Sequence, residues 1–467
     1  MNNSPTITFC TGVGTVTGAN FLLETLGGAK ILVDCGLVQG EKVAMEENHE
    51  IFPYDLSSIT ALFITHAHLD HVGRIPKLVK DGYKGPIYST PETKELAELV
   101  LTDAVAILAE EAKREGTSPL YVAADVQAVF PLWKTIEYHQ PFKVNDEVSI
   151  FLKDAGHILG SAMIEITINA DARKGRATMK ILFTGDLGNS PAPLLRDTEA
   201  VGDVDYLVME SVYGDRNHES REGRTNKFKQ VIDETIARGG TLVIPAFSID
   251  RTQVLLYELN NMVEKKLIPS IPVFVDSPMA IKATDIYKAH EDLFNDAVKA
   301  QIARGDDIFK FPKLEYTLSQ NQARDIDNAR GPKIILAGSG MSIGGRVVGH
   351  EAQYLPDAKS TILLVGYQTA GSLGRQLADG AKKVHIHHET IKVKAKIETL
   401  YGFSAHKDGD HLVQFVSTAG DEAGNAKLKQ VFTVMGEPGA SMHLAQRIND
   451  ELGVKAIMPE RGKVYEL

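Results

Sequence analysis

The hexapeptide His66-Ala67-His68-Leu69-Asp70-His71 follows the apolar run ALFI after a single threonine. The apolar run predicts a buried strand, so this HxHxDH cluster stands where a strand ends. Alternate side chains of an extended chain point the same way, which lets His66 and His68 converge on one ion. Once the chain turns, Asp70 and His71 can face a second position nearby. A histidine-rich surface loop is the plainer alternative, but four ligand-type residues in so short a span favour a metal site.

The composition is that of a globular protein large enough for two or three domains. The chain has 467 residues, 43% of them hydrophobic and 24% charged. It contains no apolar run near the roughly 18 residues that a membrane span needs, so we expect no membrane partner. The N-terminal residues lack a signal-peptide pattern, and the two cysteines are too few for a disulfide framework, which together predict a cytoplasmic protein. The net charge of −11 means that a polyanionic substrate would need a local basic groove and bound metals.

The pattern of apolar residues changes near residue 210. Before it, β-branched and aromatic runs predict short strands, with one long helix from Pro91 to Gly116. After it, helices and strands alternate, which predicts a parallel sheet covered by helices on both faces. The segment Asn295–Asn328 carries charge runs and is predicted to be irregular and solvated. The predicted strands are 6–10, 20–25, 30–34, 61–65, 148–152, 163–168, 179–184, 241–245, 273–275, 333–337 and 360–365, and helices are predicted at 224–238 and 251–265.

Three further ligand candidates stand at turns or strand ends. Asp34 precedes Cys35-Gly36, His157 lies in a glycine-flanked turn before a strand, and Asp186 follows a strand that runs into a glycine turn. A lone His or Asp in a turn is usually an ordinary loop residue. In this order with HxHxDH, however, the set resembles the metallo-β-lactamase superfamily. That resemblance implies one zinc held by His66, His68 and His157, a second held by Asp70 and His71, a bridging Asp186, and Asp34 as the residue that orients the histidines.

The rest of the chain is similar to the β-CASP nucleases, a branch of that superfamily. The stretch LVMESVYGD (207–215) resembles the first β-CASP motif, and GFSAH (402–406) matches the second. Further similar stretches are 241–251, 275–280, 338–341 and 366–368. The resemblance implies an α/β protein with a four-layer αββα metallo-β-lactamase fold, formed by residues 1–209 and 393–467. A Rossmann-like β-CASP domain of residues 210–392 would be inserted in it, with the active site in the cleft between the two.

The resemblance also implies an activity and its residues. It predicts a zinc-dependent nuclease that hydrolyses phosphodiester bonds of single-stranded RNA, as an endonuclease, a 5′-exonuclease or both. Asp70 or Asp186 would take the proton of the attacking water, and His406, steadied by Glu210, would protonate the departing oxygen. The sequence leaves single-stranded DNA open as a substrate, and a homodimer is compatible with it.

One position departs from the family pattern. Where the third motif has a histidine, the stretch VMGEP (434–438) has Met435. A thioether is a soft, neutral ligand that suits zinc poorly, so the second metal is expected to bind weakly, with Mn²⁺ as another occupant. His411 and His443 are alternative ligands, although a surface histidine is the plainer interpretation of each.

A glycine-rich loop suggests how RNA would be held. The stretch GSGMSIGGR (338–346) follows an apolar strand and precedes a predicted helix, so its N–H groups are suited to phosphate. A mere turn is the plainer reading of such a cluster. Basic residues in comparable positions favour a groove that follows the RNA backbone without reading sequence. The predicted substrate-binding residues are Arg251, Ser339, Gly340, Met341, Arg346 and Arg375.

Two other functions compete with the nuclease. A glyoxalase-type ester or thioester hydrolase would share the first half of the chain, but it has no use for a β-CASP insert. A metal-impaired, RNA-binding scaffold has only Met435 in its favour, because the other ligands are intact.

Overall fold

A computed structural model describes residues 4–39, 42–169, 178–369, 371–420 and 428–467. The chain forms two compact units. Unit 1 contains Met1–Ala192, Arg196–Asn217 and His406–Leu467, and unit 2 contains Pro193–Leu195 and His218–Ala405. No described helix has the length and hydropathy needed to cross a membrane.

Two seven-stranded sheets face each other in unit 1. The first has the order β22-β1-β2-β3-β4-β5-β6 and the second β21-β20-β11-β10-β9-β8-β7. Their strands are β1 (Thr6–Thr11), β2 (Asn20–Glu24), β3 (Lys30–Val33), β4 (Ala61–Phe63), β5 (Ile87–Ser89), β6 (Trp133–Thr135), β7 (Phe142–Lys143), β8 (Val148–Asp154), β9 (Ala162–Ile168), β10 (Met179–Phe183), β11 (Tyr206–Glu210), β20 (Gln430–Val434), β21 (Ala456–Ile457) and β22 (Val464–Glu466).

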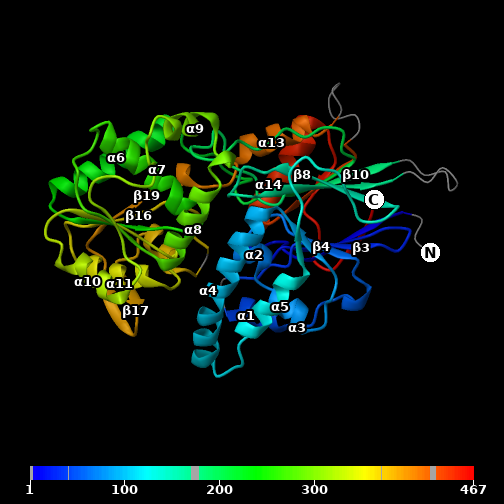
Figure 1. Cartoon of the computed structure of the whole chain (residues 1–467), viewed down its shortest axis with the longest axis horizontal. Coiled ribbons are helices and arrows are strands. Elements are labelled where there is room, and N and C mark those ends of the chain that lie inside the picture. Colours follow the sequence, from blue (N-terminus) through cyan, green and yellow to red (C-terminus); the bar gives the residue numbers. More distant parts are fainter. Residues whose placement is uncertain (1–3, 40–41, 170–177, 370, 421–427) are drawn as a thin grey trace. The chain divides into compact units, whose positions relative to one another are not determined.

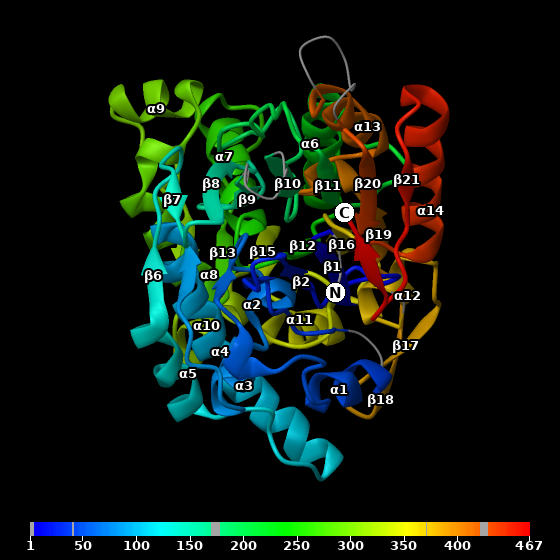
Figure 2. The same cartoon turned by 90° about the vertical axis from the view of Figure 1, so that its right-hand side faces the viewer.

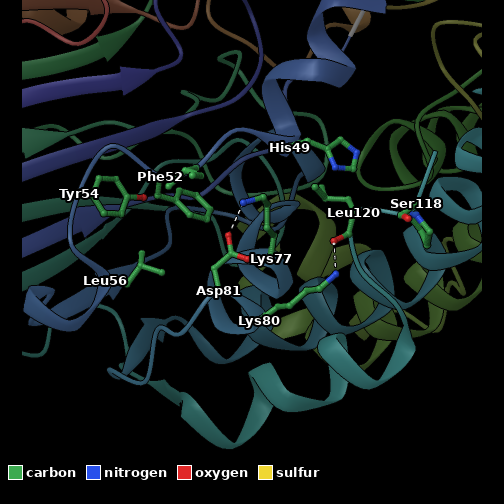
Figure 3. Close-up of a pocket in the computed structure, with 11 residues that line it drawn as sticks. His49, Phe52, Tyr54, Leu56, Lys77, Lys80, Asp81, Ser118 and Leu120 are labelled. Carbon is green, nitrogen blue, oxygen red and sulfur yellow. Dashed lines mark hydrogen bonds and ion pairs between the residues drawn. The ribbon is translucent and has the colours of Figure 1, made fainter.

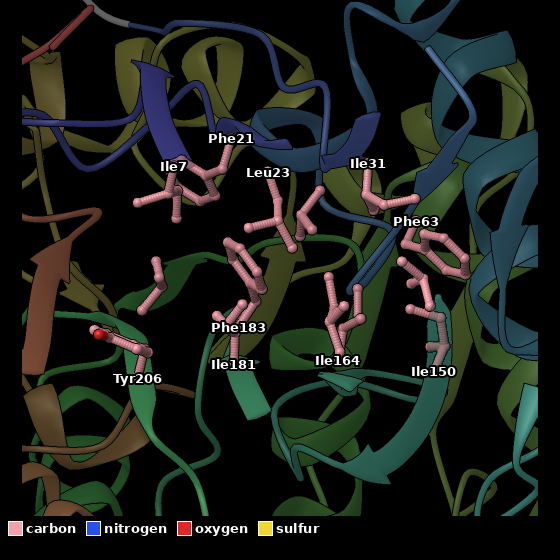
Figure 4. Packing of buried hydrophobic residues seen from close by; sticks show 14 of the residues in the cluster. Ile7, Phe21, Leu23, Ile31, Phe63, Ile150, Ile164, Ile181, Phe183 and Tyr206 are labelled. Atoms are coloured by element: carbon pink, nitrogen blue, oxygen red, sulfur yellow. The ribbon is translucent and has the colours of Figure 1, made fainter. Parts of the chain in front are cut away.

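The core of unit 1 lies between these sheets. Alternate residues of β8 are buried, as expected of a strand with one face in the core. Figure 4 shows side chains of β1–β4, such as Phe21 and Leu23, directed toward side chains of the second sheet, such as Ile164 and Phe183. Phe21 and Phe183 stack with their ring centroids 6.2 Å apart.

Helices complete the four layers of unit 1. Apolar side chains of α13 (Gly409–Thr418) and α14 (Pro438–Arg447) pack on the outer face of the second sheet. Helices on the side of β3 and β4 cover the first sheet (Figure 1), and they are α2 (Leu69–Val72), α3 (Ile75–Lys80), α4 (Pro91–Glu115) and α5 (Ala123–Val129). A further helix of the unit is α1 (Lys42–His49). This is the predicted αββα arrangement.

Unit 2 contains a six-stranded parallel sheet of order β14-β13-β15-β12-β16-β19. Strands such as β12 are buried at every position, because helices cover both faces of the sheet (Figure 1). The strands are β12 (Thr241–Pro245), β13 (Val273–Asp276), β14 (Leu314–Tyr316), β15 (Lys333–Ala337), β16 (Thr361–Leu364) and β19 (Lys396–Thr399). The helices are α6 (Arg221–Ala237), α7 (Arg251–Glu264), α8 (Pro278–Ala289), α9 (Asp296–Ala303), α10 (Gln320–Asn328), α11 (Arg346–Tyr354) and α12 (Leu373–Ala378). A separate hairpin pairs β17 (Lys383–Ile386) with β18 (Glu389–Lys392) (Figure 2).

One prediction about unit 2 is wrong. The segment Asn295–Asn328 is not irregular, because it contains α9, the edge strand β14 and α10. Charged residues interrupt its apolar pattern, but Val298, Phe309 and Ile326 are fully buried. Short helices and an edge strand bury so little surface that their hydrophobic pattern is weak. The parallel sheet with helices on both faces is confirmed.

Candidate metal centre

The HxHxDH segment begins where β4 ends, at the edge where its parallel neighbour β3 also ends. Asp34, the residue after β3, joins the two ends. Its carboxylate accepts hydrogen bonds from the Thr65 N–H and the Thr65 hydroxyl, both at 2.8 Å. His71 Nδ1 lies 2.7 Å from the same carboxylate and donates to it, which leaves His71 Nε2 free to face the cluster. Asp34 holds this place with a φ of 59°, a conformation that non-glycine residues adopt mostly at constrained sites.

Three imidazoles and one carboxylate surround a single point. His68 Nδ1 lies 3.1 Å from His66 Nε2 and 3.2 Å from His157 Nε2. Asp186 Oδ2 lies 3.4 Å from His66 Nε2 and 3.5 Å from His157 Nε2. A tetrahedral zinc with ligands at about 2.0–2.1 Å has ligand-to-ligand edges of about 3.3–3.4 Å. These four distances are therefore close to the edges of a tetrahedral zinc site, and all four atoms lie within 4.8 Å of one another.

A second group shares Asp186. His71 Nε2 lies 3.4 Å from Asp186 Oδ1 and 3.7 Å from Asp70 Oδ2. His71 Nε2 and Asp186 Oδ1 are both buried without a hydrogen-bond partner among the described residues. Buried polar atoms are rarely left unpaired, so this pair of atoms fits a cation that both could ligate. Asp186 offers one oxygen to each group.

The charges of the cluster suit a cation. Burial holds the pKa of His68 and His157 well below the usual range, so both imidazoles are neutral and able to bind a metal. Burial alone would raise the pKa of Asp186, but the neighbouring imidazoles, His71 first, lower it well below its usual value. Burial would likewise lower the pKa of His71, yet the carboxylates of Asp186, Asp34 and Asp70 raise it well above its usual value. The carboxylates thus create a strongly negative potential at the second group.

His406 and Glu210 lie beside the first group. His406 Nδ1 is 3.0 Å from Glu210 Oε2 and 3.9 Å from Asp186 Oδ2. Glu210 is fixed in turn by the Leu187 N–H, which donates to Oε1 at 2.6 Å. Burial opposes a charge on His406, but Glu210 and Asp186 outweigh it and raise the pKa of His406 to about 9. The His406 ring is directed at the cluster and carries a proton at neutral pH.

Met435 does not lie among these ligands. It follows β20 with a φ of 49° and packs in the core between the two sheets. A Cβ built on Gly12 would stand 2.9 Å from the Met435 sulfur, so the thioether lies against the Gly12 backbone. His411 Nδ1 donates to Asp408 at 2.6 Å, and His443 is exposed on α14. Neither histidine belongs to a potential metal group of the described residues.

Unit 2 gathers its predicted substrate-binding residues at the carboxyl edge of the parallel sheet. Arg251, Ser339 and Arg346 follow the ends of β12 and β15, and Arg375 lies in α12 after β16. The glycine-rich loop packs closely there. A Cβ on Gly345, whose φ is 74°, would stand 2.5 Å from the Gly338 carbonyl oxygen.

The three arginines of this edge are engaged with the protein itself. Arg346 donates to Asp276 at 2.5 Å and to the carbonyl oxygens of residues 317 and 318 at 3.1 Å. Arg375 pairs with Asp379 at 3.0 Å. Arg251 lies 3.6 Å from Asp250, and its side chain is 7% exposed. The Ser339 hydroxyl also has a protein partner, because it accepts from the Ile343 N–H at 3.1 Å, but its own proton can still be donated to a phosphate.

Sequence reasoning missed several residues of both regions. The Thr65 hydroxyl lies 3.1 Å from His66 Nδ1 and 3.3 Å from His71 Nδ1, so it links both histidines to Asp34. The position of Thr65, between the apolar strand and the HxHxDH segment, was the sequence signal that could have indicated this role. The hydroxyls of Ser248 and Ser277 lie 3.1 Å apart. A Cβ on Gly338 would meet each hydroxyl at 3.3 Å, and only the fold reveals that proximity.

A pocket of unit 1 is lined by none of the metal-ligand candidates (Figure 3). Its volume is about 490 Å³. The lysines on its wall already have partners, because Lys77 pairs with Asp81 at 2.5 Å and Lys80 donates to the Leu120 carbonyl oxygen at 3.2 Å. The complete lining is His49, Ile51, Phe52, Tyr54, Leu56, Lys77, Lys80, Asp81, Ser118, Pro119 and Leu120.

Three family models match the chain in sequence. Residues 22–173 match a metallo-beta-lactamase superfamily domain, and residues 252–377 match a Beta-Casp domain. Residues 390–459 match a Zn-dependent metallo-hydrolase RNA specificity domain.

Curated proteins of a bacterium and of archaea are similar over most of the chain. Ribonuclease TTHA0252 of Thermus thermophilus is 34% identical over 86% of this chain and 88% of its own length. Transcription termination factor FttA of Pyrococcus abyssi is 31% identical over 95% of this chain and 68% of its own length. The factor of the same name from Methanosarcina mazei is 31% identical over 93% and 67%.

Proposed function

Because the chain belongs to the β-CASP family of the metallo-β-lactamase superfamily, we propose that it is a zinc-dependent ribonuclease that cleaves single-stranded RNA. The observation that carries the proposal is the close spacing of the ligand atoms of His66, His68, His157 and Asp186, together with the buried atoms of the adjoining group that have no hydrogen-bond partner among the described residues. A ribonuclease is among the relatives that match most of the chain. A glyoxalase-type hydrolase has no use for a Beta-Casp domain, and a scaffold has no need of such ligand spacing.

The chain would hold two metals through different residues. His66, His68, His157 and Asp186 would bind the first zinc, and Asp70, His71 and Asp186 the second, with Asp186 as the bridge. Bound there, two divalent metals would polarise the scissile phosphate and acidify a water molecule. Asp34 would keep His71 in the tautomer whose Nε2 faces the metal.

Proton transfers fall to side chains of the cluster. Asp70 or Asp186 would accept the proton of the attacking water. His406, held by Glu210, would give its proton to the departing oxygen of the RNA. Hydrolysis of a phosphodiester needs one group that accepts a proton from water and another that donates a proton to the leaving oxygen.

Unit 2 would hold the RNA backbone at the carboxyl edge of its sheet. Hydroxyls of Ser248, Ser277 and Ser339, with N–H groups of the loop 338–345, would contact phosphate oxygens. Arg251, Arg346 and Arg375 would contribute positive potential and fix the surrounding loops rather than pair directly with phosphate. Contacts of this kind would bind RNA without reading its sequence.

The test is cleavage of RNA and DNA oligonucleotides by purified protein, with and without a chelator. Labels at the 5′ end and at the 3′ end, in parallel reactions, would separate endonuclease from 5′-exonuclease action. We expect cleavage of single-stranded RNA that the chelator stops. His68→Ala should lose both zinc and cleavage, while His443→Ala, an exposed histidine of the same unit, should keep both. Cleavage by His68→Ala at the wild-type rate would show that the site is assigned to the wrong residues.

A further inference from the structure

A strongly basic hairpin stands out in a chain of net charge −11. We call residues 382–394, which include β17 and β18, the basic hairpin. These 13 residues contain four lysines, three histidines and a single acidic residue, Glu389. The four lysines are exposed, and no ion pair of theirs is found within the described parts of the chain. The hairpin lies beside α12 in unit 2 (Figure 2).

The hairpin has one apolar face and one basic face. Val384 and Ile386 are 1% and 4% exposed and pack in the core of unit 2. Side chains alternate along a strand, so the opposite face presents Lys383 and His385. Lys383 pairs directly with Lys392 in the antiparallel register. Like charges directly opposite each other destabilise a hairpin, so this pair works against folding unless an anion lies over it.

The residues in the turn of the hairpin are also not those that would best stabilise the fold. His387 and His388 connect the strands with φ values of 48° and 70°. Two-residue turns with two positive φ values strongly prefer Asn-Gly, because those residues adopt the conformation at low cost. This turn instead places two exposed imidazoles at the tip, where their flat rings are accessible.

We propose that the basic hairpin binds the backbone and bases of the RNA substrate outside the cleavage site, an inference that rests on the proposed function. Ammonium groups of Lys382, Lys383, Lys392 and Lys394 match phosphates, and the imidazoles of the turn match the faces of unstacked bases. An acidic protein is a poorer match, because the exposed face has no Trp, Tyr, Phe or aliphatic anchor and lysine is depleted from protein interfaces. A lipid surface is a poorer match because no apolar side chain of the hairpin is exposed.

The hairpin is a separate contact from the glycine-rich loop of the same unit. Its second strand leads to the start of β19, at the edge where the parallel strands begin. The loop 338–345 instead follows the end of β15, at the opposite edge. An RNA long enough to reach both edges should therefore bind more tightly than a short one, and only the long RNA should sense the hairpin.

The first test neutralises the opposed lysines. Lys383→Gln with Lys392→Gln removes both charges and their repulsion, so the fold should be as stable as before or more so. Lys265→Gln with Lys310→Gln, two exposed lysines elsewhere in unit 2, is the matched control. Binding of a fluorescent 30-nucleotide RNA and a 6-nucleotide RNA is measured between 50 and 200 mM salt, in the His406→Ala background to limit cleavage.

The expected result is specific to long RNA. Loss of two phosphate contacts should reduce the slope of log Kd against log salt by about 1.4. The ratio of Kd at 200 mM salt to Kd at 50 mM salt should therefore be about sevenfold smaller for the hairpin variant than for the control. The 6-nucleotide RNA should bind all variants alike. Equal slopes for the hairpin variant and the control would overturn the proposal, and so would poly-glutamate binding as tightly as RNA.

The second test separates binding from a structural role. His387→Asn with His388→Gly installs the residues that the turn prefers, so Tm should stay the same or rise. If the imidazoles stack on bases, Kd for the long RNA should rise at least about fivefold. Unchanged Kd would remove the turn from the proposal.

If hairpin-dependent binding is found in a protein that cleaves no RNA, the proposed function fails and the hairpin assignment stands. If RNA is cleaved but all variants bind alike, the hairpin assignment fails alone.

Discussion

The metal centre of unit 1 and the carboxyl edge of unit 2 are both formed where parallel strands end, but they differ in how their side chains are used. At the metal centre, His71 Nε2 and Asp186 Oδ1 are buried with no hydrogen-bond partner among the described residues. At the edge of unit 2, the three arginines already have protein partners. The first region has side chains poised for a ligand, whereas the second relies on hydroxyls and backbone N–H groups. The comparison implies that single substitutions should be severe in the first region and mild in the second.

Among substitutions that leave the zinc in place, the largest effect is expected at His406. If it is the proton donor, His406→Ala should slow RNA cleavage by about 10²–10⁴-fold while zinc content and RNA affinity stay unchanged. The measurement is single-turnover cleavage with metal analysis of the same sample, and His443→Ala serves as the control. Loss of zinc in step with activity would make His406 a ligand instead.

A smaller effect is expected at Asp34, which contacts no predicted zinc position itself. Asp34→Asn weakens the hold on His71, and loss of such an orienting carboxylate lowers metal affinity by about 10–100-fold. Zinc titration should show the weaker affinity, and excess zinc should restore cleavage. The exposed Asp146→Asn is the control. If excess zinc gives no recovery, Asp34 supports the fold rather than the metal.

In unit 2, the mild effects should follow hydroxyls rather than guanidinium groups. Ser339→Ala should raise KM for RNA about tenfold, because a hydrogen bond to a charged phosphate is lost. Arg375→Gln should change KM less than about twofold, because Arg375 pairs with Asp379 at the end of its own helix and has no direct phosphate contact in the proposal. Steady-state kinetics on one RNA would compare them. The reverse order would break the contrast between the two regions.

The smallest effect is a gain. Met435 packs in the core rather than among the ligands, so the second metal would depend on Asp70, His71, Asp186 and solvent. Met435→His exchanges the core thioether for an imidazole. Turned out of the core toward Asp70 and His71, that imidazole should tighten the second metal and raise cleavage by about two- to fivefold at low zinc, with no gain at saturating zinc. Two equally tight metals in the wild type, with no gain in the variant, would refute this account of the second site.

The contrast between the regions also explains what the sequence could predict. The residue type alone shows which side chains can bind a metal. A short segment after a strand can place its histidines in only a few ways. The grouping of His66, His68, His157 and Asp186 was therefore predictable. The predicted strands and helices on both sides of residue 210 are all present for a similar reason, because buried strands have strong apolar patterns, but other elements such as β20 were not predicted.

The remaining features depend on contacts between distant residues. Arg346 looked available to phosphate, but Asp276, 70 residues earlier, occupies its guanidinium group. The convergence of Ser248 and Ser277 arises only when β12 and β13 are assembled in one sheet. The elements within 295–328 escaped prediction because they bury few side chains. Pairing between remote segments leaves no local signal in one sequence.

The most direct test of the central claim is RNA cleavage measured against zinc bound per chain. The protein would be stripped with a chelator, shown to remain folded, and reloaded in steps. Cleavage should be absent from the stripped wild type and return as zinc occupies the site of His66, His68, His157 and Asp186, but His68→Ala should not recover. Full cleavage by the stripped protein, or none by the fully loaded one, would contradict the account.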